Sequence, residues 1–121
     1  MKTVLIGLIT AGAIAAVPVD IAHAEIDLKK PDSLAQKAPD TFKVNMETSK
    51  GSFVIEVTRS WAPRGADRFY SLVKAGYFTD VRFFRVISRF MAQFGIHGDP
   101  AVARAWRTAQ IADDPVIKSN G

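Results

Sequence analysis

The sequence predicts a mainly β fold, with a first hairpin, one helix, two further strands and then an irregular stretch. Two runs of alternating apolar and polar residues flank a glycine-bearing turn. The apolar spacing becomes three and four after Pro63, and two apolar runs follow Gly76. Of the 121 residues 48% are hydrophobic, enough for one small domain. Most of the 8 phenylalanines stand in the second half, which predicts the core there.

The hairpin is predicted from alternation along two neighbouring segments. Phe42, Val44 and Met46 alternate with polar residues, as expected for a strand with one buried face. Residues 49–51 end in a glycine, which adopts positive φ without strain, and so suit a turn. Alternation resumes over residues 53–57, so the two runs are expected to pair as a β-hairpin.

A helix is predicted over residues 64–75, with one face on the sheet. Pro63 suits a first helical turn, because proline lacks the N–H that would be unpaired there. Apolar side chains follow at helical spacing: Ala66, Phe69, Leu72 and Val73. Gly76 stands where a C-terminal capping glycine is expected.

Two further strands are predicted, over residues 81–87 and 91–96, because both runs are strongly apolar. Ser88 and Arg89 lie between them. Beyond residue 100 the pattern weakens, and 101–111 is expected to be a short helix or an irregular loop.

The N-terminus has the layout of a secretory signal peptide over residues 1–24. Lys2 gives a positive start, residues 4–17 form an apolar run, and Ala-His-Ala at 22–24 presents small residues for cleavage. The alternative is a membrane anchor, but the run is shorter than the roughly 20 residues of a transmembrane helix. We therefore expect export to the periplasm or outside the cell, without stable membrane insertion after cleavage.

The rest of the chain is divided by composition. Residues 25–41 are polar and form a linker or N-terminal arm, and 42–121 form the folded domain. The net charge is +4, with basic residues spread along the sequence, whereas nucleic-acid binding favours a basic patch or stripe. No nucleic-acid partner is therefore expected. The absence of cysteine and a count of 2 histidines argue against a zinc site.

A candidate binding face is predicted in residues 83–95. Arg85 lies between two apolar residues of one strand face, at 83 and 87. In the next run Met91 and Gln93 share a face, and Phe90 stands at the bend. Such a set suits a mostly apolar pocket with a cation and an amide at its edge. Alternatively, Arg85 is a surface arginine lying across an apolar face, and Phe90 and Met91 are core residues.

Other polar and aromatic groups have plainer interpretations. His97 and Asp99 do not predict a catalytic triad with any serine, because nothing places them together. Asp113 and Asp114 are expected in a turn or a helix cap rather than as an acid–base pair. Both tryptophans are expected to pack against other residues.

Residues 83–95, FFRVISRFMAQFG, resemble the signature of cyclophilin-type peptidyl-prolyl cis-trans isomerases, FHRVIPGFMxQGG. The four pocket positions match at the right spacing: Arg85, Phe90, Met91 and Gln93. The hairpin with Lys50-Gly51, the Ala62-Pro63 helix start and AGYF at 75–78 also occur in the family's order. The resemblance covers residues 42–95 and is weaker through residue 121.

The sequence departs from the signature at four positions. Phe84 replaces a histidine, Ser88-Arg89 replaces Pro-Gly, and Phe94 replaces a glycine. The resemblance implies a cyclophilin-like antiparallel β-barrel with capping helices, incomplete here because the domain is expected to be C-terminally truncated. Pocket residues that the family takes from later strands have no counterpart in this sequence.

The resemblance also implies the activity. A cyclophilin of this kind catalyses rotation of X-Pro peptide bonds and would assist the folding of exported proteins, with proline-containing polypeptides as partners. Arg85 would stabilise the twisted amide, Phe90 and Met91 would hold the proline ring, and Gln93 would bind the substrate backbone. The reaction requires no metal or cofactor. The alternatives are a non-catalytic peptide-binding module and an inactive fragment, and no oligomeric state is predicted.

Overall fold

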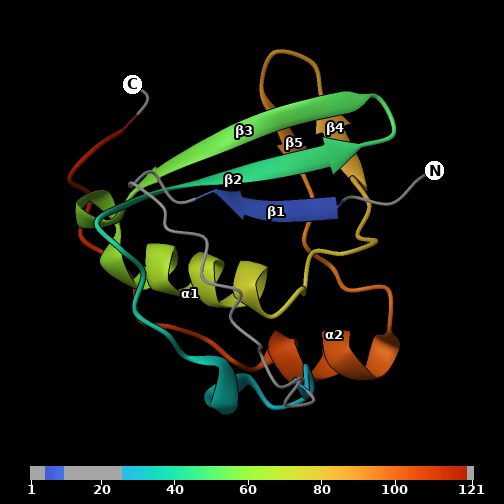
Figure 1. The fold of residues 1–121 in the computed structure, drawn as a ribbon, viewed down its shortest axis with the longest axis horizontal. Helices are drawn as coiled ribbons and strands as arrows, with labels where there is room; N and C mark the ends of the chain where they lie inside the picture. The colour runs from blue at the N-terminus through green and yellow to red at the C-terminus, as the bar shows by residue number, and fades with distance from the viewer. Residues whose placement is uncertain (1–4, 10–25, 120–121) are drawn as a thin grey trace, which may run out of the picture.

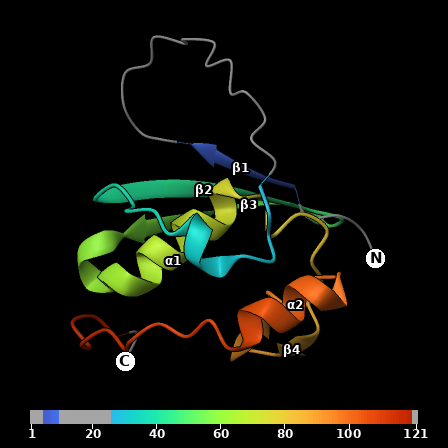
Figure 2. The same cartoon turned by 90° about the horizontal axis from the view of Figure 1, so that it is seen from below.

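The structure is a computed structural model that describes residues 5–9 and 26–119, the first of these segments by its backbone. The strands are β1 (Leu5–Ile9), β2 (Thr41–Thr48), β3 (Gly51–Thr58), β4 (Arg85–Ile87) and β5 (Met91–Gln93). The helices are η1 (Pro31–Leu34), η2 (Arg59–Trp61), α1 (Pro63–Lys74) and α2 (Pro100–Arg107). The sheet lies over α1, and α2 and the C-terminal segment lie beyond α1 (Figures 1 and 2).

The first sheet contains the predicted hairpin. Its strand order is β1-β2-β3, and β2 pairs antiparallel with β3, with Phe42 opposite Val57 and Met46 opposite Phe53. The alternation predicted for β2 is confirmed, because Phe42, Val44 and Met46 are at most 1% exposed. The second strand is less covered than predicted, since Phe53 remains 41% exposed. The first four residues of β3 are exposed, and burial increases only toward its C-terminal end.

Strand β1 falls within the predicted signal peptide. Its backbone pairs antiparallel with β2, with Leu5 opposite Glu47 and Ile9 opposite Lys43. The remainder of the predicted signal, residues 1–4 and 10–24, lies outside the described residues. The signal peptide therefore stays a prediction.

Helix α1 begins one residue before the predicted helix and ends one residue before its predicted end. Ala62, at its N-cap, has no side chain able to accept a hydrogen bond. Asp114 caps the helix instead, because its carboxylate oxygens accept from the backbone N–H of Arg64 at 3.0 Å and of Gly65 at 2.8 Å. The expectation that Asp114 serves as a cap is thus confirmed.

The C-terminus of α1 is closed by a Schellman motif. Gly76 has φ +73° and donates to the Val73 carbonyl, and Tyr77 donates to the Leu72 carbonyl. This confirms Gly76 as the capping glycine. The reversal carries the next two aromatic side chains back under the sheet, where Tyr77 and Phe78 are buried.

The core lies between β2, α1 and the segment after α1. Its buried side chains are Ala38, Phe42, Val44, Met46, Ala66, Val73, Tyr77, Phe78, Val81 and Val102. The rings of Phe42 and Tyr70 pack in an edge-to-face arrangement with their centroids 5.2 Å apart. The prediction of a core in the second half is only partly right, because β2 in the first half supplies the most deeply buried residues. Two of the later phenylalanines, Phe84 and Phe90, are exposed.

The second sheet is shorter than predicted. Only β4 and β5, three residues each, form strands within the predicted runs 81–87 and 91–96. Val81 is used in the core at 2% exposure, and Phe83 packs on Phe94 with ring centroids 5.0 Å apart. Val81 and Phe83 therefore pack their side chains against the core and do not continue the β4 strand. The described strands form sheets of three and two and do not close into a barrel.

The remaining segments attach to α1 and α2. The uncertain stretch 101–111 contains α2, whose first turn is capped by Asp99. Trp106 of α2 packs on Tyr77 at 5.6 Å and donates from Nε1 to the Leu28 carbonyl at 2.7 Å, as its predicted packing role requires. Trp61 packs less completely than predicted, since it is 48% exposed, with Lys118 Nζ 5.5 Å from its ring centroid. Among the described residues, no helix is long and apolar enough to span a membrane.

Candidate functional site

The β4–β5 hairpin brings the four predicted site residues together. Arg85 is the partner of Gln93 in the ladder, and Ile87 is the partner of Met91. Alternate residues of a strand share a face, and directly paired residues point the same way. Arg85, Met91 and Gln93 therefore lie on one face of the hairpin, together with Ile87. Phe90 lies in the turn immediately before Met91. The predicted sharing of a face by Arg85 and Ile87 is confirmed; Phe83 lies outside the strand and does not share it.

The face is open to solvent in the described part of the chain. Arg85 and Gln93 are exposed, Met91 is half-buried, and Phe90 is 79% exposed. Among the described residues, the Arg85 guanidinium makes no hydrogen bond or ion pair. The arrangement is therefore a hydrogen-bond donor and an amide side by side, next to two apolar side chains that have room to contact a ligand.

The hairpin is anchored to the core at its base. The Phe84 N–H donates to the Gln93 carbonyl at 3.1 Å, and the Tyr77 hydroxyl donates to the Gly95 carbonyl at 3.0 Å. Burial raises the pKa of Tyr77, so this hydroxyl keeps its proton and continues to donate. The Phe94 ring meets Phe78 at 5.8 Å, which fixes β5 on the buried aromatic cluster. These contacts position Arg85 and Gln93 on a firm base.

Comparison with known proteins agrees with this geometry. The family profile described as cyclophilin type peptidyl-prolyl cis-trans isomerase/CLD matches residues 43–118, which include most of β2 and the whole of β3, α1 and the β4–β5 hairpin. The chain belongs to the cyclophilin-type peptidyl-prolyl cis-trans isomerase family. Its described strands and helices form an incomplete, mainly β, cyclophilin-like fold.

Curated relatives carry the same family name. Peptidyl-prolyl cis-trans isomerase-like 1 of Emericella nidulans is 42% identical over 52 residues, which are 43% of this chain and 32% of the relative. The protein of that name in Rhizopus delemar is 45% identical over 53 residues, 44% of this chain and 32% of the relative. The Mus musculus protein is 37% identical over 65 residues, 51% of this chain and 39% of the relative.

The matched segments span about a third of the length of these relatives. No solved structure matches the chain significantly. The family is thus shown by the profile and by short, similar segments.

Two departures from the cyclophilin signature have structural consequences. Arg89 stands where the signature has glycine, and it adopts φ +59°, in the left-handed region that disfavours a residue with a Cβ. The Phe90 N–H closes this turn on the Ile87 carbonyl at 3.1 Å. Phe94, also at a glycine position of the signature, supplies the aromatic anchor of β5.

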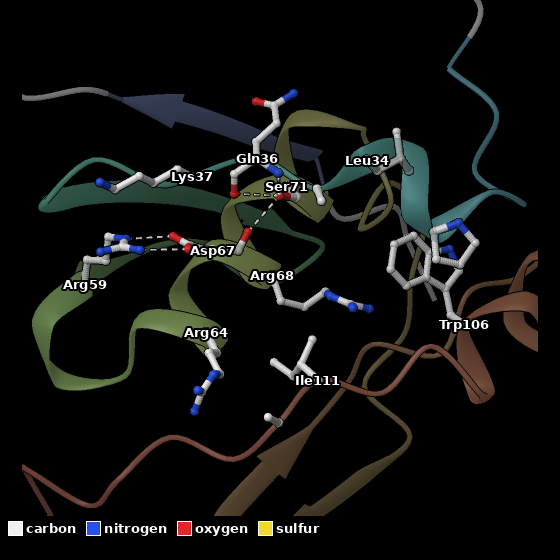
Figure 3. Close-up of a pocket in the computed structure, with 13 residues that line it drawn as sticks. Leu34, Gln36, Lys37, Arg59, Arg64, Asp67, Arg68, Ser71, Trp106 and Ile111 are labelled. Atoms are coloured by element: carbon white, nitrogen blue, oxygen red, sulfur yellow. Dashed lines mark hydrogen bonds and ion pairs between the residues drawn. The ribbon is translucent and has the colours of Figure 1, made fainter.

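A second feature of this cyclophilin-type chain is a cavity of about 510 Å³ beside α1 (Figure 3). The N-terminal arm, α1, Trp106 of α2 and the segment after α2 line it. Its basic side chains are Lys37, Arg59, Arg64 and Arg68, and its one acidic side chain is Asp67. The basic residues are spread along the sequence, but the fold gathers these four.

The cavity is organised around an ion pair. Arg59 donates from Nε to Asp67 Oδ1 at 2.8 Å and from a terminal nitrogen to Oδ2 at 2.9 Å. Asp67 Oδ1 also accepts from the Ala38 N–H at 2.8 Å. The Arg59 hydrogen bonds hold the pKa of Asp67 below its ordinary value, with a smaller contribution from the Ala38 N–H, although burial acts in the opposite direction.

The sequence offered one weak signal for this cavity. Arg64 and Arg68 are four residues apart, so they lie on one face of a helix. Lys37 and Arg59 join them only through the packing of the arm against α1, where the buried Ser71 hydroxyl accepts from the Gln36 N–H at 2.8 Å.

Other chemistry-bearing groups do not form a site. His97 Nδ1 accepts from the Asp99 backbone N–H at 3.0 Å, and Asp99 caps α2, so neither belongs to a triad. Within the described residues, no group of three or more histidine, cysteine, aspartate or glutamate side chains could hold a metal ion.

Proposed function

We propose that this chain catalyses cis-trans rotation of X-Pro peptide bonds, with Arg85 as the catalytic residue. The observation that carries the proposal is the pairing of Arg85 with Gln93 on one open face beside Phe90 and Met91. Family membership supports the reaction class. The substrates are proline-containing segments of polypeptide chains.

The chemistry requires electrostatic help rather than a nucleophile. Amide resonance gives the peptide bond a rotational barrier of about 18–20 kcal/mol. In the twisted state the proline nitrogen regains its lone pair and becomes a hydrogen-bond acceptor. A guanidinium that donates there stabilises the twisted state more than the planar amide, and so speeds rotation. Arg85 can do this because its N–H groups make no hydrogen bond to the described residues.

The neighbouring side chains would orient the substrate. Gln93 can donate to and accept from the peptide backbone, because its amide carries both functions. Phe90 and Met91 offer an aromatic ring and a flexible thioether to the apolar proline ring. The exposure of Phe90, at 79%, leaves its ring free for such a contact.

The test is a prolyl-peptide isomerisation assay on the 121-residue chain. Uncatalysed exchange takes about 10–100 s, so added protein should shorten it measurably. Arg85→Ala should abolish the acceleration. Arg82→Ala is the matched control, because Arg82 is exposed, lies in the preceding loop and has no proposed role. Equal acceleration by the Arg85→Ala variant would exclude Arg85 as the catalytic residue.

A second candidate is a non-catalytic module that binds proline-containing peptides. The open face favours it, because the described residues do not enclose the hairpin and so do not exclude water from Arg85. Peptide binding without rate acceleration, retained in Arg85→Ala and lost in Phe90→Ala, would identify this function. An inactive fragment would show neither binding nor acceleration.

We further propose that the protein is exported and assists the folding of exported proteins. The layout of residues 1–24 supports this, with a basic start, an apolar run and a small-residue cleavage site. Mass spectrometry of the protein recovered outside the cytoplasm should show a new N-terminus at residue 25. A product that keeps Met1 would exclude cleavage.

A further inference from the structure

We propose that the basic cavity beside α1 binds an acidic peptide segment in which a carboxylate side chain stands next to apolar side chains. The cavity is lined by the arm, α1 and the segment after α2, and by none of the four residues of the candidate active site. The proposal is therefore independent of isomerase activity.

Acidic side chains neutralise only some of the positive charges in the cavity. Arg59 is neutralised by its two hydrogen bonds to Asp67. Asp40 and Asp114 also lie near Arg59, and the Asp114 carboxylate is occupied by the N–H groups at the start of α1. No described acidic side chain forms an ion pair with Lys37, Arg64 or Arg68. The cavity therefore carries positive charge that an anionic ligand would balance.

Two guanidinium groups are held in place with donors to spare. Arg64 donates from one terminal nitrogen to the Asp113 carbonyl at 2.6 Å, and Arg68 does so to the Ala109 carbonyl at 2.9 Å. Neutral carbonyls orient the groups without cancelling their charge. A guanidinium has several N–H donors in a planar fork, so most remain for a carboxylate. In Figure 3 the Arg68 side chain extends past Ile111 toward Trp106, whereas the Arg64 side chain extends away from Ile111.

Apart from Gln36 and Ser71, the rest of the lining is apolar. Pro31 and Leu34 contribute from the arm, and Ile111 and Ala112 from the segment after α2. Ile111 is 42% exposed, so part of this apolar surface lacks a partner within the described chain. Trp106 adds an aromatic wall, over which Arg68 lies at 5.0 Å.

These features select the ligand class. The volume of about 510 Å³ lies within the range of ligand pockets, about 300–1,000 Å³. Free phosphate would use the cations but not the apolar wall, and a purely apolar segment would leave the cations uncompensated. An acidic residue between apolar residues satisfies both.

The test uses NMR titration of the ¹⁵N-labelled 121-residue chain with acetyl-Leu-Glu-Leu-amide. The indole N–H of Trp106, in the cavity lining, should shift, and that of Trp61, outside the lining, should not. The isosteric acetyl-Leu-Gln-Leu-amide and inorganic phosphate are the comparison probes. Both should bind at least about tenfold more weakly, as expected when a charge-assisted hydrogen bond or the apolar contact is lost.

Three variants make the test specific. Arg68→Gln should weaken peptide binding about tenfold, again the size of a charge-assisted hydrogen bond. Lys37→Gln removes an exposed charge that makes no hydrogen bond or ion pair to the described residues. It should weaken binding severalfold, and it remains a valid test if Arg68→Gln does not fold. Arg82→Gln lowers the net charge equally at an exposed site outside the cavity lining and should leave binding unchanged.

Several results would overturn the proposal. Equal affinity for the glutamine peptide would show that the carboxylate charge does not contribute to binding. Equal affinity for phosphate would show that the apolar residues of the cavity do not contribute. Unchanged binding in Lys37→Gln and Arg68→Gln would place the peptide elsewhere. Loss of acidic-peptide binding in Arg85→Ala would assign the peptide to the β4–β5 hairpin. If Arg85→Ala loses isomerisation but keeps acidic-peptide binding, the two sites are distinct.

Discussion

Arg85 and Gln93 lie directly opposite each other in the ladder of β4 and β5, and their side chains project from the same face of the hairpin. Eight positions separate them in the chain, so neither side chain is placed by its own strand alone. The turn at Ser88 and Arg89 sets the register, and a shift of one residue would move Gln93 to the opposite face. The proposed chemistry thus depends on this turn.

The first prediction separates the roles of the paired residues. Arg85→Ala should lower kcat/KM for a prolyl peptide by about 10²–10³-fold, the usual loss when one donor to a transition state is removed. Gln93→Ala should act mainly on KM, because a backbone contact is made in ground state and transition state alike. Steady-state kinetics with both variants checks this; a fall in kcat alone for Gln93→Ala would contradict it.

The second prediction concerns Arg89, whose φ of +59° is unfavourable for a residue with a Cβ. Arg89→Gly should stabilise the fold by about 1 kcal/mol, because glycine adopts this conformation without strain. Chemical denaturation would measure the gain. Arg89→Ala is the control: it removes the same charge but keeps the Cβ, and a similar gain from alanine would show that charge rather than backbone strain is responsible.

The third prediction concerns the cap that Asp114 supplies to α1 from far along the chain. Asp114→Ala should destabilise the fold by about 1 kcal/mol, because two backbone N–H groups lose their acceptor. For a domain of this size that corresponds to a fall in Tm of about 4–8 °C. The neighbouring Asp113 contacts Arg64 through its backbone carbonyl, so Asp113→Ala should leave Tm nearly unchanged.

The fourth prediction is a pH dependence set by Asp67. Hydrogen bonds from Arg59 lower its pKa in the folded state, so the folded chain binds fewer protons than the unfolded chain. The stabilisation is fully present above the ordinary carboxyl pKa of about 4 and is lost as pH falls through the lower folded value.

Unfolding free energies measured from about pH 6 to pH 2 should therefore fall less steeply in Asp67→Asn than in the wild type. Asp32→Asn, at an exposed side chain of the arm, should keep the wild-type slope. An unchanged slope in Asp67→Asn would show that the ion pair with Arg59 does not contribute to acid sensitivity.

The locally encoded elements were predicted well. The β2–β3 hairpin follows from alternation around a short turn, and α1 follows from its apolar spacing and the pair Pro63 and Gly76. The prediction failed where packing outweighed local pattern. Val81 and Phe83 have the composition of a strand, but burial against the core holds them outside β4.

The candidate active site was predicted in part for the same reason. Alternation places Arg85 and Ile87 on one face, and the signature match marks Arg85 and Gln93, but only the register of β4 on β5 makes the two side chains neighbours. The openness of this face could not be read from the sequence, since exposure depends on which other elements cover the hairpin.

The sequence by itself determined the family and the main secondary structure, and it marked Arg85, Phe90, Met91 and Gln93 as the candidate site residues. These features depend on spacing along a short stretch of chain. Tertiary structure alone decided that Asp114 caps α1 and that Lys37, Arg59, Arg64 and Arg68 line one cavity. The physical reason is separation along the chain. Contacts between distant residues form only when apolar burial brings the arm, α1 and the last segment together. Local sequence patterns do not predict these contacts.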